Sequence, residues 1–352
     1  MEKQKQINRR SIQKMPRISI IVLNWNGQKH LETCFNSIKE QDYENFETLL
    51  VDNGSADNSV EFVEKNFPFV RVIKLKENIG FASGNNVGIK EATGDYILTL
   101  NNDTKLEKAC LKNLMEVVEK NPEIGMFSLK MMFFYEPDLI NSTGTLIYKD
   151  GSAMNRGMKQ KDEKQFEQIE EIFGPCAGAA LYKKEMLEDI KLGDDEYFDN
   201  DFFIYLEDAD LSLRAQLKNW KSLYIPTSVI HHVHSATMQA KSPIKLYLSE
   251  RNRIWYTLKD YPMSLFLKTP YYTFKRYISL LKNLKKSTES KSNFKKTDLI
   301  KALLKAWLVG ILLSPKILKK RRHIQKNKKI SKKEFYELIE KYSASISDIV
   351  NS

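Results

Sequence analysis

A polar triplet with one carboxylate, Asn101-Asn102-Asp103, stands where it could bind a cation. It directly follows residues 96–100, a mostly apolar run that is typical of a buried strand. In open α/β sheets, ligands collect at the carboxyl ends of strands, where a carboxylate can hold a hard divalent cation against a diphosphate. Turns rich in Asn and Asp also follow strands for conformational reasons alone, so the triplet needs support from other motifs.

A second polar pair, Asp52-Asn53, follows another apolar run at residues 46–51. A carboxylate there can accept the imide N–H of a uracil or thymine ring, or it can form an Asx turn or helix cap. Residues 77–88 hold three Gly and three Asn before an expected helix. Open backbone N–H groups at a helix start attract phosphate, although this run lacks the lysine of a P-loop.

Three carboxylates lie within four residues at Glu207, Asp208 and Asp210, where an amphipathic helix is expected to begin. Acidic residues favour the first helical turn through the helix dipole, which accounts for one or two of them. Neighbouring carboxylates also raise one another's pKa, which would help one of them act as a base toward a sugar hydroxyl.

The chain has a histidine cluster at His231, His232 and His234, at the end of a strand-like run after Pro226. If the segment is extended, alternation places His232 on the face opposite its neighbours. Both a structural role and a metal-ligand role are open for these imidazoles.

The elements that must position these side chains follow an alternating plan. Apolar runs predict strands at residues 18–23, 46–51, 70–75 and 96–100, and helices are expected at about 30–41, after 57, and at 85–92. This alternation indicates a doubly wound, mostly parallel α/β sheet. Regularity weakens from about 140 to 173 and returns at 177–183 and 222–225, and the chain reads as helical after Pro243.

The charge of the chain is unevenly distributed. The 352 residues, 42% of them hydrophobic, can bury a large core. Residues 239–352 carry 27 Lys and Arg against 8 Asp and Glu, whereas the first 238 residues carry 29 against 37. We therefore expect a polar, disordered leader at 1–16, a catalytic domain at 17–240 and a basic helical region at 241–352 that meets anions, either nucleic acid or an anionic membrane.

Targeting signals are absent from the sequence. Cys34, Cys110 and Cys176 show neither disulfide nor zinc spacing, which fits a reducing cytosol. The first fifteen residues lack the apolar core of a signal peptide, and no apolar run reaches the eighteen or so residues needed to span a bilayer. A cytoplasmic location is expected.

Taken in order, the motifs at residues 18–26, 51–55, 78–82, 100–104 and 207–211, together with His232, resemble the family 2 glycosyltransferases of GT-A fold. The resemblance covers roughly residues 17–260 and is strongest to the rhamnosyltransferase-like subgroup. It implies inverting transfer of a sugar, with rhamnose as the first candidate, from a dTDP- or UDP-linked donor. The implied acceptor is an oligosaccharide or lipid-linked saccharide hydroxyl in cell-surface polysaccharide synthesis.

The same resemblance implies roles for single residues in binding the donor. Asp52 would hold the pyrimidine base, with Asn24 and Trp25 completing its pocket. The nucleotide-sugar site would extend to Asn53 and Asn78.

The resemblance also implies a metal site and a catalytic base. Asp103 would bind Mn²⁺ or Mg²⁺, with His232 as an extra ligand. Asn101, which stands where the family has a first Asp, would hydrogen-bond ribose or sugar instead. Asp208 would be the general base and Glu207 its rival, because adjacent helical residues point about 100° apart and only one can face the acceptor.

Other functions are weighed against this one. A sugar nucleotidyltransferase needs a Gly-rich loop with Arg and Lys after its first strand, where this chain has Asn24, Trp25, Asn26 and Gly27. A nucleic-acid binder is disfavoured because the tail has no recognisable reading module, and a non-catalytic membrane-surface relative is the remaining alternative. The aromatic and basic residues after 243 predict peripheral attachment to the inner face of the membrane, with aromatic side chains in the interface. A helical appendage packed on the catalytic domain is the alternative for that region.

Overall fold

The computed structural model describes residues 16–233, 242–284, 295–345 and 348. The leader expected at 1–16 lies outside the described residues except for Pro16. His234 and the domain boundary expected at 240 also lie outside them.

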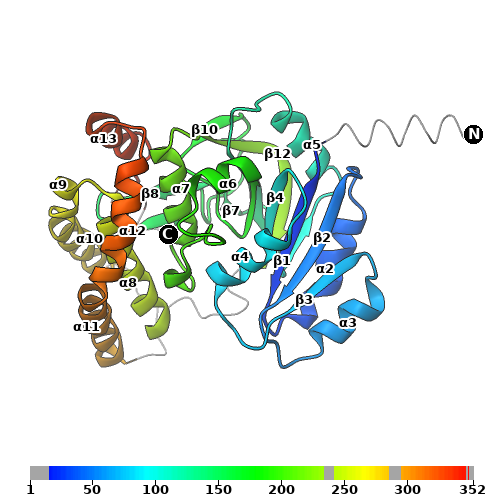
Figure 1. Ribbon diagram of the computed structural model, residues 1–352, viewed down its shortest axis with the longest axis horizontal. Helices are drawn as coiled ribbons and strands as arrows, with labels where there is room; N and C mark the ends of the chain where they lie inside the picture. Colours follow the sequence, from blue (N-terminus) through cyan, green and yellow to red (C-terminus); the bar gives the residue numbers. More distant parts are fainter. Residues whose placement is uncertain (1–15, 234–241, 285–294, 346–347, 349–352) are drawn as a thin grey trace, which may run out of the picture.

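A mostly parallel sheet forms the centre of the molecule (Figure 1). Its strand order is β10-β12-β6-β11-β4-β1-β2-β3, with β1 to β4 mutually parallel and β6 parallel to β12. The antiparallel strand β11 separates these two groups. The main strands are β1 (Ile18–Asn24), β2 (Phe46–Asp52), β3 (Val70–Lys74), β4 (Tyr96–Asn101), β6 (Met126–Phe133), β10 (Glu170–Ile172), β11 (Ala179–Lys183) and β12 (Ser222–His232). The expected α/β class is confirmed.

Short strands complete the sheet on its β6 and β12 side. Strand β5 (Thr104–Leu106) pairs with β12 and β7 (Ile140–Ser142) pairs with β6, while β8 (Thr145–Ile147) and β9 (Ala153–Asn155) form a separate ladder. Strand β12 runs well beyond the expected end at 225. It passes Pro226 through a register shift between Ile225 and Val229, which accommodates a residue without a backbone donor.

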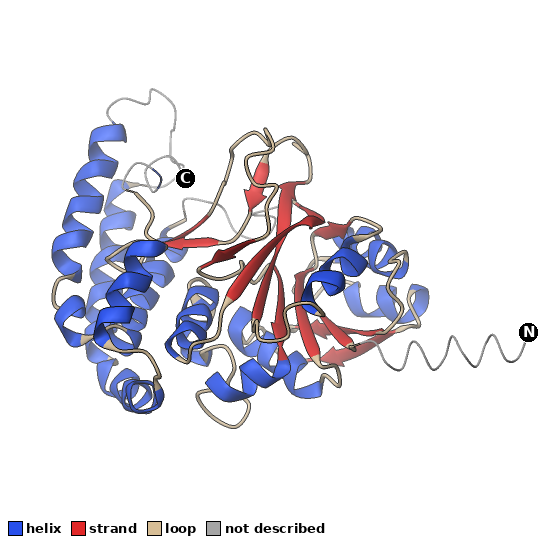
Figure 2. Ribbon diagram, turned by 90° about the horizontal axis from the view of Figure 1, so that it is seen from above, coloured by secondary structure: helices blue, strands red, loops and turns tan. Residues whose placement is uncertain are grey.

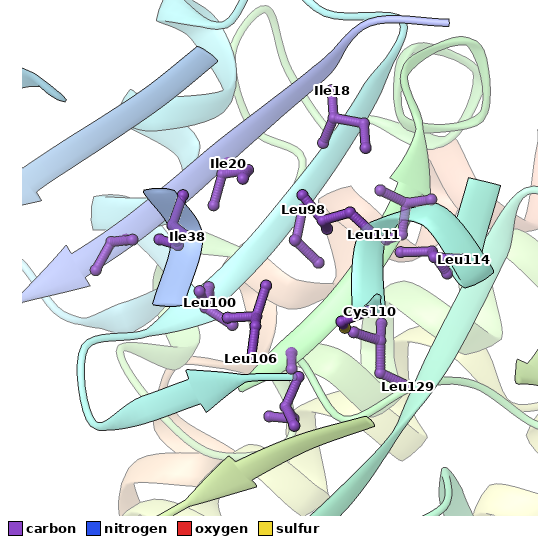
Figure 3. Close-up of a cluster of buried hydrophobic side chains, with 14 of the residues drawn as sticks. Ile18, Ile20, Ile38, Leu98, Leu100, Leu106, Cys110, Leu111, Leu114 and Leu129 are labelled. Carbon is purple, nitrogen blue, oxygen red and sulfur yellow. The ribbon is translucent and has the colours of Figure 1, made fainter. Parts of the chain in front are cut away.

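Helices cover both faces of the sheet (Figure 2). On one face lie α2 (Gln28–Lys39), α3 (Ser59–Asn66) and α5 (Cys110–Val118), and on the other α4 (Phe81–Glu91), α6 (Lys184–Ile190) and α7 (Glu207–Leu217). Figure 3 shows the first core, where Ile20, Leu98 and Leu100 of the strands pack near Leu111 and Leu114 of α5. Burial of such apolar faces is the main stabilising contribution to the fold.

Helix α4 begins four residues before the expected start at 85. The backbone N–H groups of Phe81 and Ala82 both donate to the carbonyl oxygen of Phe203, at 2.6 and 3.1 Å. These first N–H groups of a helix have no partner within the helix itself. A carbonyl supplied by a distant segment therefore sets the start of the helix.

The C-terminal region forms a helical layer against the α7 side of the α/β part of the chain (Figures 1 and 2). The layer contains α8 (Pro243–Asp260), α9 (Met263–Phe266), α10 (Thr269–Leu284), α11 (Lys296–Leu312), α12 (Ser314–Asn327) and α13 (Lys332–Lys341). Outside this layer, a one-turn helix η1 (Asn200–Phe202) precedes α7. Trp255, Tyr256 and Tyr261 lie in the buried core of the layer. The expectation that aromatic residues after 243 lie in a membrane interface is wrong for these three, which pack between α8 and the neighbouring helices, whereas Tyr271 and Phe274 of α10 are exposed.

Buried ion pairs join this helical layer to the α/β part of the chain. The ammonium group of Lys259, which is fully buried, pairs with Asp199 and lies 2.5 Å from Asp210. Lys320 pairs with Asp199 at 2.5 Å. Part of the positive charge of the C-terminal region thus neutralises acidic residues just before and inside α7.

A second buried network ties α8 and α10 to the loop after β8. Arg276 pairs with Asp150 at 2.8 Å and with Glu250 at 2.7 Å, and Arg253 pairs with Glu250 at 2.8 Å. Arg253 is therefore committed to internal contacts rather than to solvent. In the part of the chain that the structure describes, no helix combines the length and apolar character needed to cross a membrane.

Candidate active site at the carboxyl edge of the sheet

The strand register brings three predicted site residues to one edge of the sheet. Asn24 at the end of β1 pairs with Asp52 at the end of β2, and Leu23 pairs with Asn101 at the end of β4. Because parallel strands end at the same edge, these three residues lie along one edge of the sheet although they are far apart in the sequence.

Asn24 is the centre of a buried hydrogen-bond network at this edge. Its Nδ2 donates to Oδ1 of Asp52 and to Oγ of Ser55, both at 3.1 Å, and its Oδ1 accepts from Nδ2 of Asn102 at 2.6 Å. A Cβ on Gly27 would lie 1.9 Å from that Asn102 nitrogen, so the close approach requires glycine. Asn102 is a site residue that the sequence analysis did not single out for binding.

The turn before α4 is held by Asn53 and Asn78. Nδ2 of Asn53 donates to Oδ1 of Asn78 at 3.0 Å, and Oδ1 of Asn53 accepts from the backbone N–H of Ile79 at 2.9 Å. The same Asn78 oxygen accepts from the N–H of Gly80. These amides shape the turn before α4, while Trp25 lies partly exposed in the turn after β1.

Asp103 and His232 form the second half of the site. Nε2 of His232 lies 3.1 Å from Oδ1 of Asp103 and 3.3 Å from Nδ2 of Asn101, and its Nδ1 lies 3.1 Å from Oδ1 of Asn141. Burial alone would raise the pKa of Asp103, but the hydrogen bond and charge of His232 bring it below the usual value. Asp103 is therefore a carboxylate at neutral pH.

Alternation along β12 distinguishes the two described histidines as expected. His232 faces Asp103, whereas His231 points to the opposite face and contacts Glu107 at 3.3 Å. The structure thus brings together Asp103, Asn101 and His232 and leaves His231 out.

His30, in the first turn of α2, is a neighbour that sequence reasoning missed. Its buried Nε2 has no hydrogen-bond partner. Burial lowers the pKa of His30, although the negative charge of Asp103 acts in the opposite direction. Its only signal in the sequence is its position just after the turn that follows the first strand. No point among the described residues is surrounded by three or more His, Cys, Asp or Glu side chains suited to a metal.

The α7 carboxylates have different surroundings. Glu207 is only 6% exposed and its Oε2 has no partner, whereas Asp208 is partly exposed and its Oδ2 accepts from the N–H of Ala177 at 3.3 Å. Burial raises the pKa of both, and the charge of Asp208 adds to the effect on Glu207. The third carboxylate, Asp210, pairs with Arg214 and Lys259 and belongs to the buried network instead.

Two consecutive residues, Ala177 and Gly178, connect Asp208 of α7 with Asn101 at the end of β4. The N–H of Ala177 donates to Asp208, and the carbonyl oxygen of Gly178 accepts from the N–H of Asn101 at 2.9 Å. A Cβ on Gly178 would lie 3.2 Å from Nδ2 of Asn101. The candidate site therefore combines a raised-pKa carboxyl group, a carboxylate–imidazole pair and a network of hydrogen-bonded polar side chains.

Comparisons with known proteins are consistent with this arrangement. Residues 19–191 match glycosyl transferase family 2. The chain is 24% identical over 220 residues to the poly-beta-1,6-N-acetyl-D-glucosamine synthase of Staphylococcus epidermidis, covering 62% of this chain and 50% of the synthase. It is 24% identical over 249 residues to the putative glycosyltransferase EpsH of Bacillus subtilis, covering 66% of each chain. This chain thus spans half the length of the synthase.

Two solved structures share the fold. The structure of GalNAc-T7 with UDP, GalNAc and Mn²⁺ matches with a TM-score of 0.57 and 14% identity over 70% of this chain and 48% of that one. TarS of S. aureus matches with a TM-score of 0.54 and 19% identity over 93% of this chain and 55% of that one. These similarities confirm the GT-A-like fold expected from the sequence.

Proposed function

We propose that this chain, whose residues 19–191 match glycosyl transferase family 2, is an inverting glycosyltransferase that uses a nucleotide diphosphate sugar. The observation that carries the proposal is the link that Ala177 and Gly178 make between Asp208 and Asn101, whose Nδ2 lies 3.3 Å from Nε2 of His232 in the Asp103–His232 pair. Direct displacement with inversion needs one base on the acceptor side and charge neutralisation on the leaving-group side. A glycoside hydrolase would instead need two carboxyl groups flanking the scissile bond.

The Asp103–His232 pair fits a divalent cation. Two adjacent ligands of an octahedral ion at about 2.1 Å lie roughly 3.0 Å apart, close to the 3.1 Å between Oδ1 of Asp103 and Nε2 of His232. Oδ1 of Asn141 can accept a hydrogen bond from Nδ1–H, which leaves the lone pair of the neutral ring on Nε2, facing the carboxylate. A cation between Nε2 and the carboxylate would be bound by both groups.

Asp103 and His232 would hold Mn²⁺ or Mg²⁺, and donor diphosphate and water would supply the remaining ligands. The ion would neutralise negative charge on the departing nucleoside diphosphate. The Mn²⁺ in the GalNAc-T7 structure supports a metal-dependent reaction.

Asp208 is the proposed general base. It is partly exposed and its pKa is raised by burial, which brings its basicity closer to that needed at neutral pH. In the reaction it would take the proton from the acceptor hydroxyl as the hydroxyl oxygen bonds to the anomeric carbon. Glu207 is more deeply buried than Asp208 and stays protonated more readily, so we propose that it supports the structure around Asp208 rather than acting as the base.

The proposed donor is a pyrimidine nucleotide sugar. Oδ1 of Asp52 accepts from Asn24 and Oδ2 accepts from the N–H of Ser55, and each oxygen keeps a second lone pair for an imide N–H. Uracil and thymine offer the same imide edge, so UDP- and dTDP-linked donors are both proposed. Rhamnose remains the predicted sugar from the subgroup resemblance, and neither relative described above is named a rhamnosyltransferase.

The proposed acceptor is a saccharide hydroxyl, free or lipid-linked, in cell-surface polysaccharide synthesis. The printed name of the Staphylococcus epidermidis relative, a polysaccharide synthase, supports this class. A lipid-linked acceptor would be reached from the inner face of the membrane, where the basic C-terminal region can meet anionic lipid. Nucleic acid has no part in this proposal.

A panel of nucleotide sugars, with and without Mn²⁺, tests the proposal on the wild type and on Asp103→Ala. We expect metal-dependent release of the nucleoside diphosphate from one donor, lost in the variant. Binding of no nucleotide sugar at all would favour a non-catalytic relative. Formation of a nucleotide sugar from a sugar phosphate and a nucleoside triphosphate would favour a nucleotidyltransferase.

A further inference from the structure

Helix α11 lies at the periphery of the helical layer (Figure 1), and large apolar side chains on one of its faces are exposed to solvent. Its exposed side chains recur at helical spacing, and Leu304, Leu308 and Ile311 are 63%, 59% and 68% exposed. The α11 face is defined as Ile300, Leu304, Trp307, Leu308, Ile311 and Leu312. Soluble surfaces rarely gather this many large apolar side chains without a binding role.

The opposite side of α11 is firmly packed on α8. Ala306 is fully buried, and the carbonyl oxygen of Gly310 accepts from Nε1 of Trp255 at 3.2 Å. A Cβ on Gly310 would approach Ile254 to 3.0 Å. Small residues thus pack α11 closely against α8. Its large apolar side chains lie on the opposite side of the helix and face solvent.

The charge around this face indicates its occupant. Residues 296–327, which span α11 and α12, hold nine Lys and Arg and one acidic residue. Lys301, Lys305, Lys319 and Arg322 are exposed. Like charges oppose pairing of two copies through this face, whereas an anionic lipid surface attracts basic side chains and accepts apolar ones.

We propose that the α11 face docks on an anionic lipid surface, with α11 lying in the plane of the interface. Amphipathic helices with basic flanks bind in this manner, with the apolar side chains buried at the acyl boundary. This inference does not rest on the transfer reaction.

Vesicle binding tests the docking face. We expect the full chain to bind phosphatidylglycerol–phosphatidylcholine vesicles in flotation. A Leu304→Glu/Leu308→Glu double variant should bind at least about tenfold more weakly. The matched control is Ile169→Glu, which changes an apolar residue of the catalytic body that is 50% exposed and should bind as the wild type does.

Trp307 provides a second readout within the same experiment. Its emission should shift to shorter wavelength on vesicle binding, and Trp307→Phe should lose that shift. Equal vesicle binding by the wild type and the double variant would overturn the proposal, as would no binding by the wild type. If light scattering shows a wild-type dimer that the double variant converts to a monomer, the face joins two copies and the lipid assignment is wrong.

A separate observation concerns the loop that leads into the proposed base. Phe203, Tyr205 and Leu206 all have positive φ angles, of 66°, 75° and 68°. Bulky residues rarely adopt this backbone conformation, so surrounding contacts must hold it. Leu206 directly precedes Glu207 and Asp208, and the loop conformation therefore fixes where those carboxylates point.

Asn252 of α8 supplies those contacts. It is fully buried, and its Nδ2 donates to the carbonyl oxygens of Phe202, Ile204 and Tyr205 at 2.9, 3.0 and 2.8 Å. Its Oδ1 accepts from Nε and Nη2 of Arg251, which orients the amide. Nη2 of Arg251 also donates to the carbonyl of Phe202.

We infer that Asn252 is a positioning residue that holds the loop before α7 and thereby aims Asp208 at the acceptor. This inference rests on the proposed function. The carbonyl oxygen of Phe203, in the same loop, accepts hydrogen bonds from the first N–H groups of α4. The loop therefore also contacts the start of α4, next to the turn held by Asn53 and Asn78.

The test compares acceptor transfer with donor hydrolysis in Asn252→Asp, because hydrolysis in the absence of acceptor does not need the base on a sugar hydroxyl. We expect transfer kcat to fall at least about tenfold while donor KM and hydrolysis stay within about twofold. A purely structural loss would lower transfer and hydrolysis together. Thr257→Val is the matched control, since its buried hydroxyl bonds only to carbonyls within α8.

Two further variants keep the outcomes distinguishable. If Asn252→Asp fails to fold by circular dichroism, Arg251→Gln removes the guanidinium that orients the amide and should give a smaller change in the same ratio. If Asp208→Asn retains transfer, the proposed function fails. If Asp208→Asn is inactive and Asn252→Asp transfers at the wild-type rate, the positioning role is overturned.

Discussion

Nε2 of His232 lies 3.1 Å from Oδ1 of Asp103, across the pairing of β12 with β5. His232 is on β12, and Asp103 directly precedes β5. The strand pairs His232 with Thr104, the residue after Asp103. Backbone pairing thus fixes the separation of the two side chains, and Asn141 fixes the ring of His232 from behind. A site built on paired backbone holds its ligands at a constant distance.

The first prediction concerns metal affinity. His232→Ala should weaken Mn²⁺ binding in the presence of UDP at least about tenfold, and Asn141→Ala should weaken it by a similar or smaller factor, because outer-shell partners orient the ligand. Electron paramagnetic resonance of free Mn²⁺ measures both. His231→Ala is the matched control, since that ring faces Glu107 on the other side of the strand. Equal losses in His231→Ala and His232→Ala would contradict the assignment.

The second prediction separates the two neighbouring carboxyl groups of α7. Asp208→Asn should reduce transfer kcat by about 100-fold or more, the usual contribution of a general base, with donor affinity by calorimetry nearly unchanged. Glu207→Gln should reduce it far less, because its side chain is more deeply buried than that of Asp208. A larger loss of transfer kcat in Glu207→Gln than in Asp208→Asn would assign the role of general base to Glu207.

The third prediction is a pH dependence of stability. Burial and the charge of Asp208 raise the pKa of Glu207 well above its usual value. The folded state therefore holds this proton more tightly than the unfolded state. The associated stability is complete below the unfolded pKa of about 4.3 and is lost as pH rises through the higher folded pKa.

Glu207→Gln removes that loss because glutamine cannot ionise. Its Tm should match the wild type near about pH 5 and exceed it increasingly toward about pH 9. Glu64→Gln, at an exposed carboxyl paired with Lys74, should follow the wild-type curve. A constant Tm difference between wild type and Glu207→Gln across this range would refute the raised pKa.

The fourth prediction concerns the buried cation that joins α8 to the catalytic body. Lys259→Met leaves Asp199 and Asp210 buried without their shared partner, which should cost about 3–5 kcal/mol of unfolding free energy. Lys74→Met, which breaks an exposed pair with Glu64, should cost less than about 1 kcal/mol. Urea denaturation monitored by circular dichroism measures both, and similar values for the two variants would rule out the proposed role of burial.

Much of the catalytic fold could be predicted from local patterns. The runs that form β1 to β4 were expected to within about a residue of their observed ends, because strands buried on both faces read as continuous apolar segments. Residue types at strand ends indicated Asp52 and Asp103 as site candidates, the crowded carboxylates at a helix start indicated Asp208, and alternation correctly separated His231 from His232.

Other features depend on contacts between distant segments and could not be read locally. The start of α4 follows from the Phe203 carbonyl, and the burial of Trp255 and Tyr256 follows from how the C-terminal helices pack. Aromatic and basic residues interleaved along a helix fit both a membrane face and a packed interior. Only the tertiary contacts of each side chain distinguish these environments.

The sequence by itself determined the α/β class, the strand ends that carry polar side chains and the identity of the candidate chemical groups, because these depend on periodicity and residue type. Tertiary structure decided that Asp210 belongs to a buried ion network, that Asp208 is more accessible than Glu207, and that α11 carries the exposed apolar face. Accessibility and pairing depend on which segments meet in three dimensions, and neighbours along the chain do not specify that.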